Sequence, residues 1–199
     1  MSRNSARNIT REHLAHLAAR IMAEDGVEDH ALAKRKAARQ AGSPDTRQLP
    51  DNDEIDAALE IYRGLYQRDH PAQLLELREC AVEIMRELSR FNPYLTGSVL
   101  NGNAGKFADI QIQVFAESDK EVELDLLNRG VRYESASIKL YAGDLPIDAA
   151  VLSFEHQAIT VRLTVLTVRE LRARIKASPN GKPIERAAQA DVEILLAQG

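Results

Sequence analysis

Residues 97–112 read GSVLNGNAGKFADIQI, and this stretch decides the fold prediction. It follows a short apolar strand candidate at 94–96, begins with Gly97 and Ser98, and runs through a glycine-rich segment. It ends in strict alternation, because Ile110 and Ile112 are separated by polar residues, which is typical of a half-buried strand. The pattern predicts a strand, a short helical segment and a second strand.

Two familiar glycine motifs are excluded by single residues. A P-loop requires a glycine where the chain has Leu100, and a serine or threonine where Phe107 follows Lys106. A dinucleotide-binding fingerprint can use Gly102 and Gly105, but Leu100 again replaces its first glycine. Neither type of phosphate loop therefore explains the glycines.

Three parts of the stretch resemble the active-site signature of the DNA polymerase β-like nucleotidyltransferase superfamily. Gly97-Ser98 matches the Gly-Ser that ends the first strand, and Gly102-Asn103-Ala104 matches a following Gly-x-Ala. Residues 109–112, Asp-Ile-Gln-Ile, take the place of the strand that reads Asp-hydrophobic-Asp-hydrophobic. The resemblance covers about residues 92–115. A similar core behind a helical N-terminal region is found in a group of proteobacterial proteins that the whole chain resembles.

The resemblance implies transfer of a nucleotidyl group from a nucleoside triphosphate to an acceptor with Mg²⁺. Two carboxylates at i and i+2 of a strand lie on one face, where they can share the metal ions that neutralise the phosphates. The catalytic positions are Asp109 and Gln111, with Asp109 as the metal ligand. The residues expected to contact the nucleotide are Gly97, Ser98, Lys106 and Arg162.

The chain departs from the signature at the second carboxylate, which is the neutral Gln111. A third carboxylate is expected on a later strand, but the strand candidate 158–167 offers Arg162 between two threonines. An arginine there would repel a metal ion and could instead contact a phosphate or a carboxylate. Asp148 and Glu155 flank the preceding strand as further carboxylate candidates.

Three functions therefore stay open. The first is a nucleotidyltransferase with an eroded metal site, and the alternative is a catalytically inactive regulatory module that binds a nucleotide or a partner. The third is a structural interaction protein in which the motif is accidental. A third carboxylate beside Asp109 would favour the enzyme, whereas Arg162 in the metal position would favour the binding module.

The rest of the chain predicts an α+β fold, in which helices pack on a nucleotidyltransferase-like mixed β-sheet. A helical N-terminal region is expected over 1–50 and the nucleotidyltransferase-like domain over 51–199, with its core at 91–168. Helices are predicted from apolar spacing and capping residues at 10–25, 28–40, 53–68, 70–90, 120–128 and about 183–198. Further strands are predicted at 108–115, 131–141, 149–154 and 158–167, with a turn at 155–157.

Composition limits the compartment and the chemistry. The 199 residues contain 26 Lys and Arg against 30 Asp and Glu, a net charge of −4, which argues against a general nucleic-acid coat. The single cysteine, Cys80, cannot form an internal disulfide or a cysteine-based zinc cluster. No run of about 18 apolar residues is present, so we expect no membrane span and a cytoplasmic location.

The helical N-terminal region carries the most basic segment, residues 34–39, Lys-Arg-Lys-Ala-Ala-Arg. Such a helix face is compatible with solvent exposure, with an intramolecular acidic neighbour, or with a nucleic-acid or protein partner. Exposed apolar positions on the first two helices would also suit a homodimer.

Overall fold

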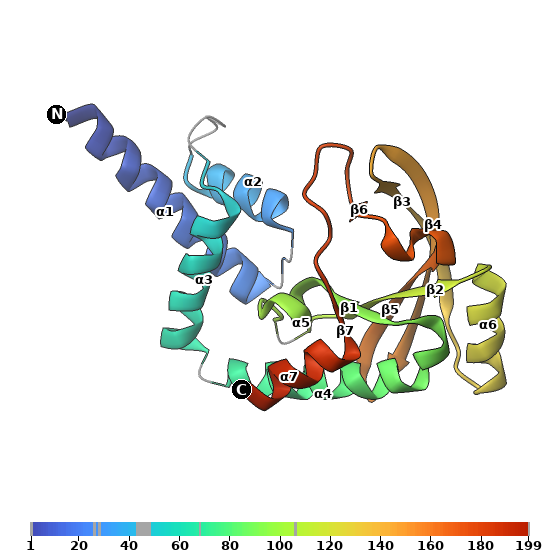
Figure 1. The fold of residues 1–199 in the computed structure, drawn as a ribbon. Helices are drawn as coiled ribbons and strands as arrows, with labels where there is room; N and C mark the ends of the chain where they lie inside the picture. Colours follow the sequence, from blue (N-terminus) through green and yellow to red (C-terminus); the bar gives the residue numbers. More distant parts are fainter. Residues whose placement is uncertain are drawn as a thin grey trace. The chain divides into compact units, whose positions relative to one another are not determined.

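The computed structural model describes residues 2–25, 27, 29–42, 49–67, 69–105 and 107–198 (Figure 1). The helices are α1 (Ser2–Asp25), α2 (His30–Gln40), α3 (Asn52–Tyr66), α4 (His70–Glu87), α5 (Gly97–Asn101), α6 (Asp119–Asn128) and α7 (Gln189–Gln198), with short 3₁₀ helices η2 (Ser89–Phe91) and η3 (Val168–Arg172). The strands are β1 (Tyr94–Thr96), β2 (Ile110–Ala116), β3 (Glu134–Ala142), β4 (Leu145–His156), β5 (Ile159–Thr167), β6 (Ile175–Lys176) and β7 (Arg186–Ala188).

The chain divides into two compact units. One contains Met1–Gln73 and Asn103–Phe107, and the other contains Leu74–Gly102 and Ala108–Gly199. The expected α+β class is confirmed, with a helical N-terminal region and a mixed sheet. The helix predicted over 53–68 belongs to the first unit.

Two expected helix starts are wrong. The first helix begins at Ser2 and not at residue 10. The segment from 183 contains β7, and α7 begins only at Gln189. The local residue pattern does not predict β7, because this short strand depends on its long-range hydrogen bonds to β1.

The first unit has a core of small side chains. Alanines dominate the buried faces of α1 and α2, where Ala18, Ala33 and Ala37 have no exposed surface. They pack with Ile55 and Leu59 of α3, which are also fully buried. Side chains this small let the helices approach closely, and the alanine-rich sequence therefore reflects close packing as well as helix propensity.

The N-terminus of α3 is closed by a reciprocal capping box. Asp51 Oδ1 accepts from the Glu54 N–H at 2.8 Å, and the Asp51 N–H donates to Glu54 Oε2 at 2.8 Å. Arg11 of α1 donates to both carboxylates, and its hydrogen bond to Glu54 lowers the pKa of that carboxyl below its usual value. Asp51 and Glu54 therefore cap α3 and tie it to α1.

The second unit is built on a seven-stranded sheet with the order β6-β3-β4-β5-β2-β1-β7. β2 and β5 are parallel over seven residue pairs, from Ile110 beside Val161 to Ala116 beside Thr167. The other strand pairs are antiparallel. The prediction of a mixed sheet is confirmed.

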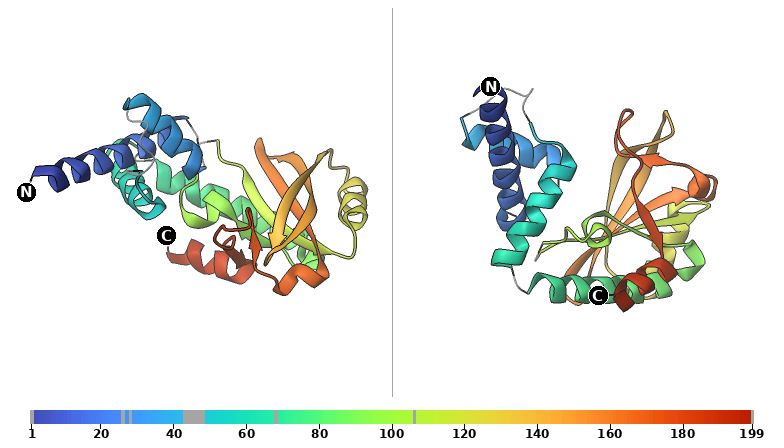
Figure 2. Two further views of the ribbon diagram at one scale, coloured as in Figure 1. Left: turned by 90° about the horizontal axis from the view of Figure 1, so that it is seen from above. Right: turned by 60° about the vertical axis from the view of Figure 1, so that its left-hand side comes forward.

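The two faces of this sheet differ in chemistry. One face is apolar and almost fully buried, with Leu95, Ile110, Ile112, Val114, Leu152, Val161 and Leu163. Figures 1 and 2 show α4 and α7 lying along one side of the sheet. The opposite face carries polar side chains near the β2 N-terminus and a second apolar cluster toward the β2 C-terminus. That cluster is Phe115, Leu140, Ala149, Leu166 and Ile175, against which Leu171 and Ile184 pack.

A two-residue turn joins β4 to β5. His156 pairs with Ile159, so the turn consists of Gln157 and Ala158, and His156 belongs to the strand. Both turn residues are left-handed, with φ of 51° and 64°. Such a turn matches the twist of the flanking strands, although neither residue is the glycine or asparagine that this backbone favours.

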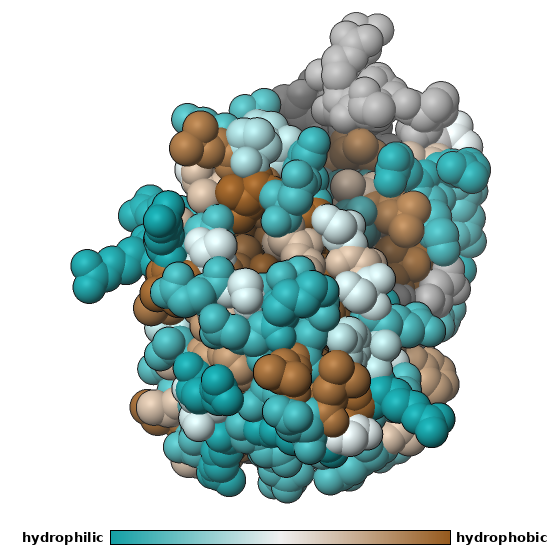
Figure 3. All heavy atoms as spheres, turned by 90° about the vertical axis from the view of Figure 1, so that its right-hand side faces the viewer, coloured by the Kyte–Doolittle hydropathy of each residue, from teal (hydrophilic) through white to brown (hydrophobic). Residues whose placement is uncertain are grey.

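No helix in the described part of the chain is both long and apolar enough to cross a membrane. Figure 3 shows the side of the molecule on which α6 lies in Figure 1, and hydrophilic residues cover most of it. Apolar residues form small separate patches there. On α6, Leu124 and Leu127 are each 59% exposed.

The capping box predicts a measurable loss of stability. Asp51→Ala removes the acceptor for the Glu54 N–H and one partner of Arg11, and we expect it to lower the free energy of unfolding by about 1 kcal/mol. Asp53→Ala is the matched control, because Asp53 lies in the same first turn without a capping hydrogen bond, and it should cost about 0.3 kcal/mol. Urea unfolding followed by circular dichroism measures both. Equal losses would show that only the helix dipole is affected.

Candidate functional site

A row of polar side chains crosses the sheet where the sequence motif enters β2. Thr96 of β1 lies beside Gln111 of β2, which lies beside Arg162 of β5, and Arg162 lies beside Ser153 of β4. We call Thr96, Gln111, Arg162 and Ser153 the polar row. Residues opposite one another in a sheet share a face and are about 5 Å apart from strand to strand, so the four side chains form one continuous strip.

Arg162 neutralises the carboxylate that the motif places at the start of β2. Its Nη2 lies 2.7 Å from Asp109 Oδ2. The side chain of Arg162 is 53% exposed, whereas that of Asp109 is only 23% exposed. The guanidinium is therefore more accessible than the carboxylate, and it has further N–H groups left over, since an arginine has five donors.

Gly97 is required for two reasons. Its φ of +74° lies in the left-handed region, and an added Cβ would lie 2.9 Å from both Cδ and Oε1 of Gln111. The Gln111 amide thus packs directly against the Gly97 backbone. Gly97 and Gln111 were predicted to belong to one site, and the structure brings them into contact.

Ser98 and α5 are held from behind by an arginine of α4. Ser98 is only 8% exposed, and α5 ends at Gly102, whose N–H donates to Ser98 O. Arg78 donates to the carbonyls of Val99 and Leu100 at 3.1 and 3.0 Å, and burial lowers its pKa. The Gly-Ser turn is therefore a tightly supported structure in which the serine is largely covered.

The continuation of the motif is fixed within the first unit. Arg63, 6% exposed, donates to Asn103 O at 2.8 Å, and burial lowers its pKa to about 10. Asn103 Nδ2 donates to Asp56 Oδ1 at 3.1 Å, and His70 Nε2 lies 2.8 Å from Ala104 O. Lys106, the expected phosphate contact, lies outside the described residues.

The donor set does not fit a pair of magnesium ions. Asp109 is the one carboxylate of the motif, it is engaged by Arg162, and the neighbouring Gln111 is neutral. Glu155 Oε1 accepts from Thr160 Oγ1 at 2.9 Å, with β5 between it and β2. Asp148 lies near the other end of β4. Among the described residues, no group of three or more His, Cys, Asp or Glu is placed to hold a metal ion.

Four neighbours of the site were missed from the sequence. Thr96 and Ser153 are the outer members of the polar row; in the register, Arg186 of β7 lies beside Thr96 and Glu134 of β3 lies beside Ser153. Arg186 stacks over Tyr94 at 4.8 Å and Phe115 at 5.5 Å, which turns its guanidinium toward the apolar cluster. The alternation of polar residues within each strand was visible in the sequence. The strand order that brings these residues together was not.

The contact between Gly97 and Gln111 predicts how much stability is lost when Gly97 is replaced by alanine. Gly97→Ala adds both an unfavourable φ and a clash with Gln111, whereas Gly143→Ala adds only the φ, because Gly143 has φ +65° and no atom within 4 Å of an added Cβ. Gly143→Ala should cost about 1 kcal/mol of unfolding free energy. Gly97→Ala should cost at least about 1 kcal/mol more. Equal costs in urea denaturation would contradict the close packing.

The site thus consists of the polar row, the Asp109–Arg162 ion pair and the Gly97–Gln111 contact, all carried by the second unit. No protein-family model matches the chain, and a search of curated proteins finds no relative of it.

Proposed function

We propose that the protein is a nucleotidyltransferase-like binding module that holds a nucleotide or another phosphate-bearing ligand without metal catalysis. The observation that carries the proposal is the 2.7 Å ion pair between Arg162 and Asp109. Arg162 supplies, in a fixed position, the positive charge that a metal ion would otherwise bring to the ligand's phosphates.

The chemistry of the ion pair supports a ligand that is an anion. Asp109 occupies one edge of the guanidinium, and more than half of the Arg162 side chain remains exposed. A planar guanidinium held by a carboxylate on one edge can donate paired hydrogen bonds to phosphate oxygens from another edge. Asp109 then shares the guanidinium with the ligand and competes with it for the positive charge.

The surroundings add neutral donors to this charge. Gln111 and Thr96 lie on the same strip, although Thr96 is buried and its hydroxyl donates to Gln111 O at 3.3 Å. Ser153 flanks Arg162 on the other side and is partly exposed. Arg162 is therefore the strongest anion-binding group of the polar row, and Gln111 and Ser153 are the neutral groups beside it.

Calorimetric titration with ATP, in EDTA and then with Mg²⁺, tests the proposal. We expect binding in EDTA that Mg²⁺ does not strengthen, and Arg162→Gln should weaken it by about tenfold or more because a charged hydrogen bond to phosphate is lost. Asp109→Asn should leave this binding intact or tighten it, since a competing carboxylate is removed. A catalytic metal site requires the opposite result for Asp109→Asn.

Arg169→Gln is the matched control for the loss of one positive charge. Arg169 is exposed and lies in η3, beyond the carboxyl end of β5 and away from the polar row. Its replacement should leave ATP affinity unchanged within about twofold, because exposed charges are screened. Binding that depends on Mg²⁺ and disappears in Asp109→Asn would overturn the proposal in favour of the enzyme.

Restoring acidic residues should convert the site. The double substitution Gln111→Asp with Arg162→Asp creates the carboxylate pattern that divalent cations bind, so we expect Mn²⁺ affinity to rise by about tenfold or more over the natural chain. Electron paramagnetic resonance of free Mn²⁺ measures this. The single substitution Gln111→Asp retains Arg162 and should gain much less; an equal gain would show that Arg162 does not control the metal position.

A further inference from the structure

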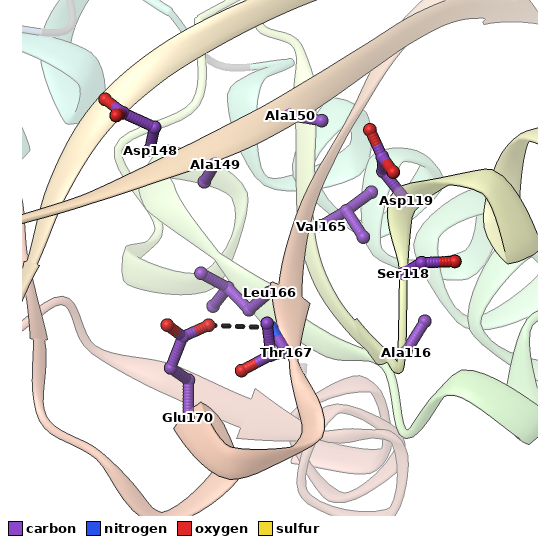
Figure 4. A pocket seen from close by; sticks show the side chains of 10 residues that line it. All are labelled: Ala116, Ser118, Asp119, Asp148, Ala149, Ala150, Val165, Leu166, Thr167 and Glu170. Atoms are coloured by element: carbon purple, nitrogen blue, oxygen red, sulfur yellow. Dashed lines mark hydrogen bonds between the residues drawn. The ribbon is translucent and has the colours of Figure 1, made fainter.

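A cavity of about 300 Å³ lies at the other end of β2 and β5 (Figure 4). Ala116 and Thr167, which end the two parallel strands, both line it. Six residues of β2 lie between Asp109 and Ala116, so the cavity is about 20 Å from Asp109 along an extended strand. It is therefore a separate candidate site from the polar row.

The cavity forms because the sheet forks. β4 and β5 pair only as far as Ala150 beside Val165, after which β4 continues with β3 and β5 continues with β2. Asp148 and Ala149 therefore line one side of the fork, and Leu166 and Thr167 line the other. Figure 4 shows the two ribbons separating at this point.

The connections that follow β2 and β5 form opposite walls. Ser118 and Asp119 lead from β2 into α6, and Glu170 belongs to η3 after β5; Figure 4 shows these residues on opposite sides of the cavity. Crevices outside the carboxyl ends of parallel strands, where the following connections diverge, are the usual ligand sites of open sheets. A volume of about 300 Å³ is sufficient for a small organic molecule.

The charged residues that line the cavity favour a cationic ligand. It contains the carboxylates of Asp119, Asp148 and Glu170, and no lysine, arginine or histidine is among the ten residues that form it. Glu170 Oε2 already accepts from the Thr167 N–H at 2.7 Å, the bond drawn in Figure 4. Asp119 Oδ1 likewise accepts from the Lys120 N–H at 2.9 Å, so Asp148 has the most acceptor capacity, and Asp119 retains its second oxygen as an acceptor.

The same lining favours an organic cation over a metal ion. The three carboxylates come from different walls, and within the described residues they do not form a metal-binding group. Between them the surface is aliphatic, with Ala116, Ala149, Ala150, Val165 and Leu166. An apolar body with an ammonium at its end satisfies both parts of this surface.

We propose that this cavity binds the ammonium group of a small aliphatic amine, with Asp119 and Asp148 as its anionic partners. The amine is either a free diamine or the side chain of a lysine, since both present an ammonium on a short hydrocarbon stem. Lys139, which lies opposite Asp148 in the β3–β4 register, competes with the incoming cation.

Titration of the full ¹⁵N-labelled chain with 1,4-diaminobutane at low ionic strength tests the site. We expect saturable amide shifts confined to residues 116–119, 148–150 and 165–170. Asp148→Asn should weaken binding by about tenfold or more, because a charge-assisted hydrogen bond is lost. Lys139→Gln should tighten it, since a neighbouring positive charge is removed.

Asp144→Asn is the matched control, because Asp144 is a 95% exposed carboxylate on the same hairpin but outside the cavity. It should leave the affinity unchanged within about twofold, because exposed charges are screened.

Ala150→Leu, with folding verified by its melting curve, should block the cavity and abolish the shifts. Shifts scattered over other surface carboxylates, or an equal effect of Asp144→Asn, would overturn the proposal. Nα-acetyl-lysine amide is titrated in parallel. Tighter binding of this compound would indicate a lysine side chain as the ligand, and tighter binding of 1,4-diaminobutane would indicate a free diamine.

Discussion

The parallel pairing of β2 with β5 is the interaction on which the second unit depends. It brings together strands separated by more than forty residues, and its register fixes which side chains are neighbours on both faces. On one face it aligns Ile110, Val161 and their apolar neighbours into the buried core. On the other face it places Gln111 beside Arg162. A shift of one residue would exchange these two faces, so the core and the polar row are specified by the same hydrogen bonds.

The chemistry of an acidic motif depends on its neighbours more than on its own residues. Asp109 stands where a nucleotidyltransferase-like signature places a metal ligand, yet its partner in the structure is a guanidinium. A carboxylate that is neutralised by a fixed cation attracts divalent ions far less than a free one, because the ion would have to displace that cation. The strand geometry of such a site can therefore persist while its ligand preference changes from metal to anion.

Local patterns were sufficient for most elements and for the residues of the motif. The alternation around Ile110 and Ile112 predicted β2, and the expected short helical segment after β1 is present, with Gly97 and Ser98 as its first two residues. The ends of elements were less predictable: β7 forms because β1 offers an open edge, and its three residues have no strand signal of their own.

The parts of the site that the sequence could not show depend on strand order. Arg162 was predicted as a nucleotide contact at the place of a missing carboxylate, but its ion pair with Asp109 follows from β5 lying next to β2. The fork between β4 and β5 has no local signature, because both strands continue as regular strands beside other partners. Asp148 could therefore be named as a carboxylate but could not be assigned to a cavity.

The turn between β4 and β5 has a practical consequence for experiments on this chain. Gln157 and Ala158 both adopt a left-handed backbone, which costs roughly 1–2 kcal/mol for each residue that is not glycine. The double substitution Gln157→Asn with Ala158→Gly should therefore raise the free energy of unfolding, because asparagine and glycine adopt this turn backbone at lower cost. The turn belongs to neither the polar row nor the cavity. The doubly substituted chain would be more stable, so that variants too unstable in the natural sequence could still be purified and assayed in it.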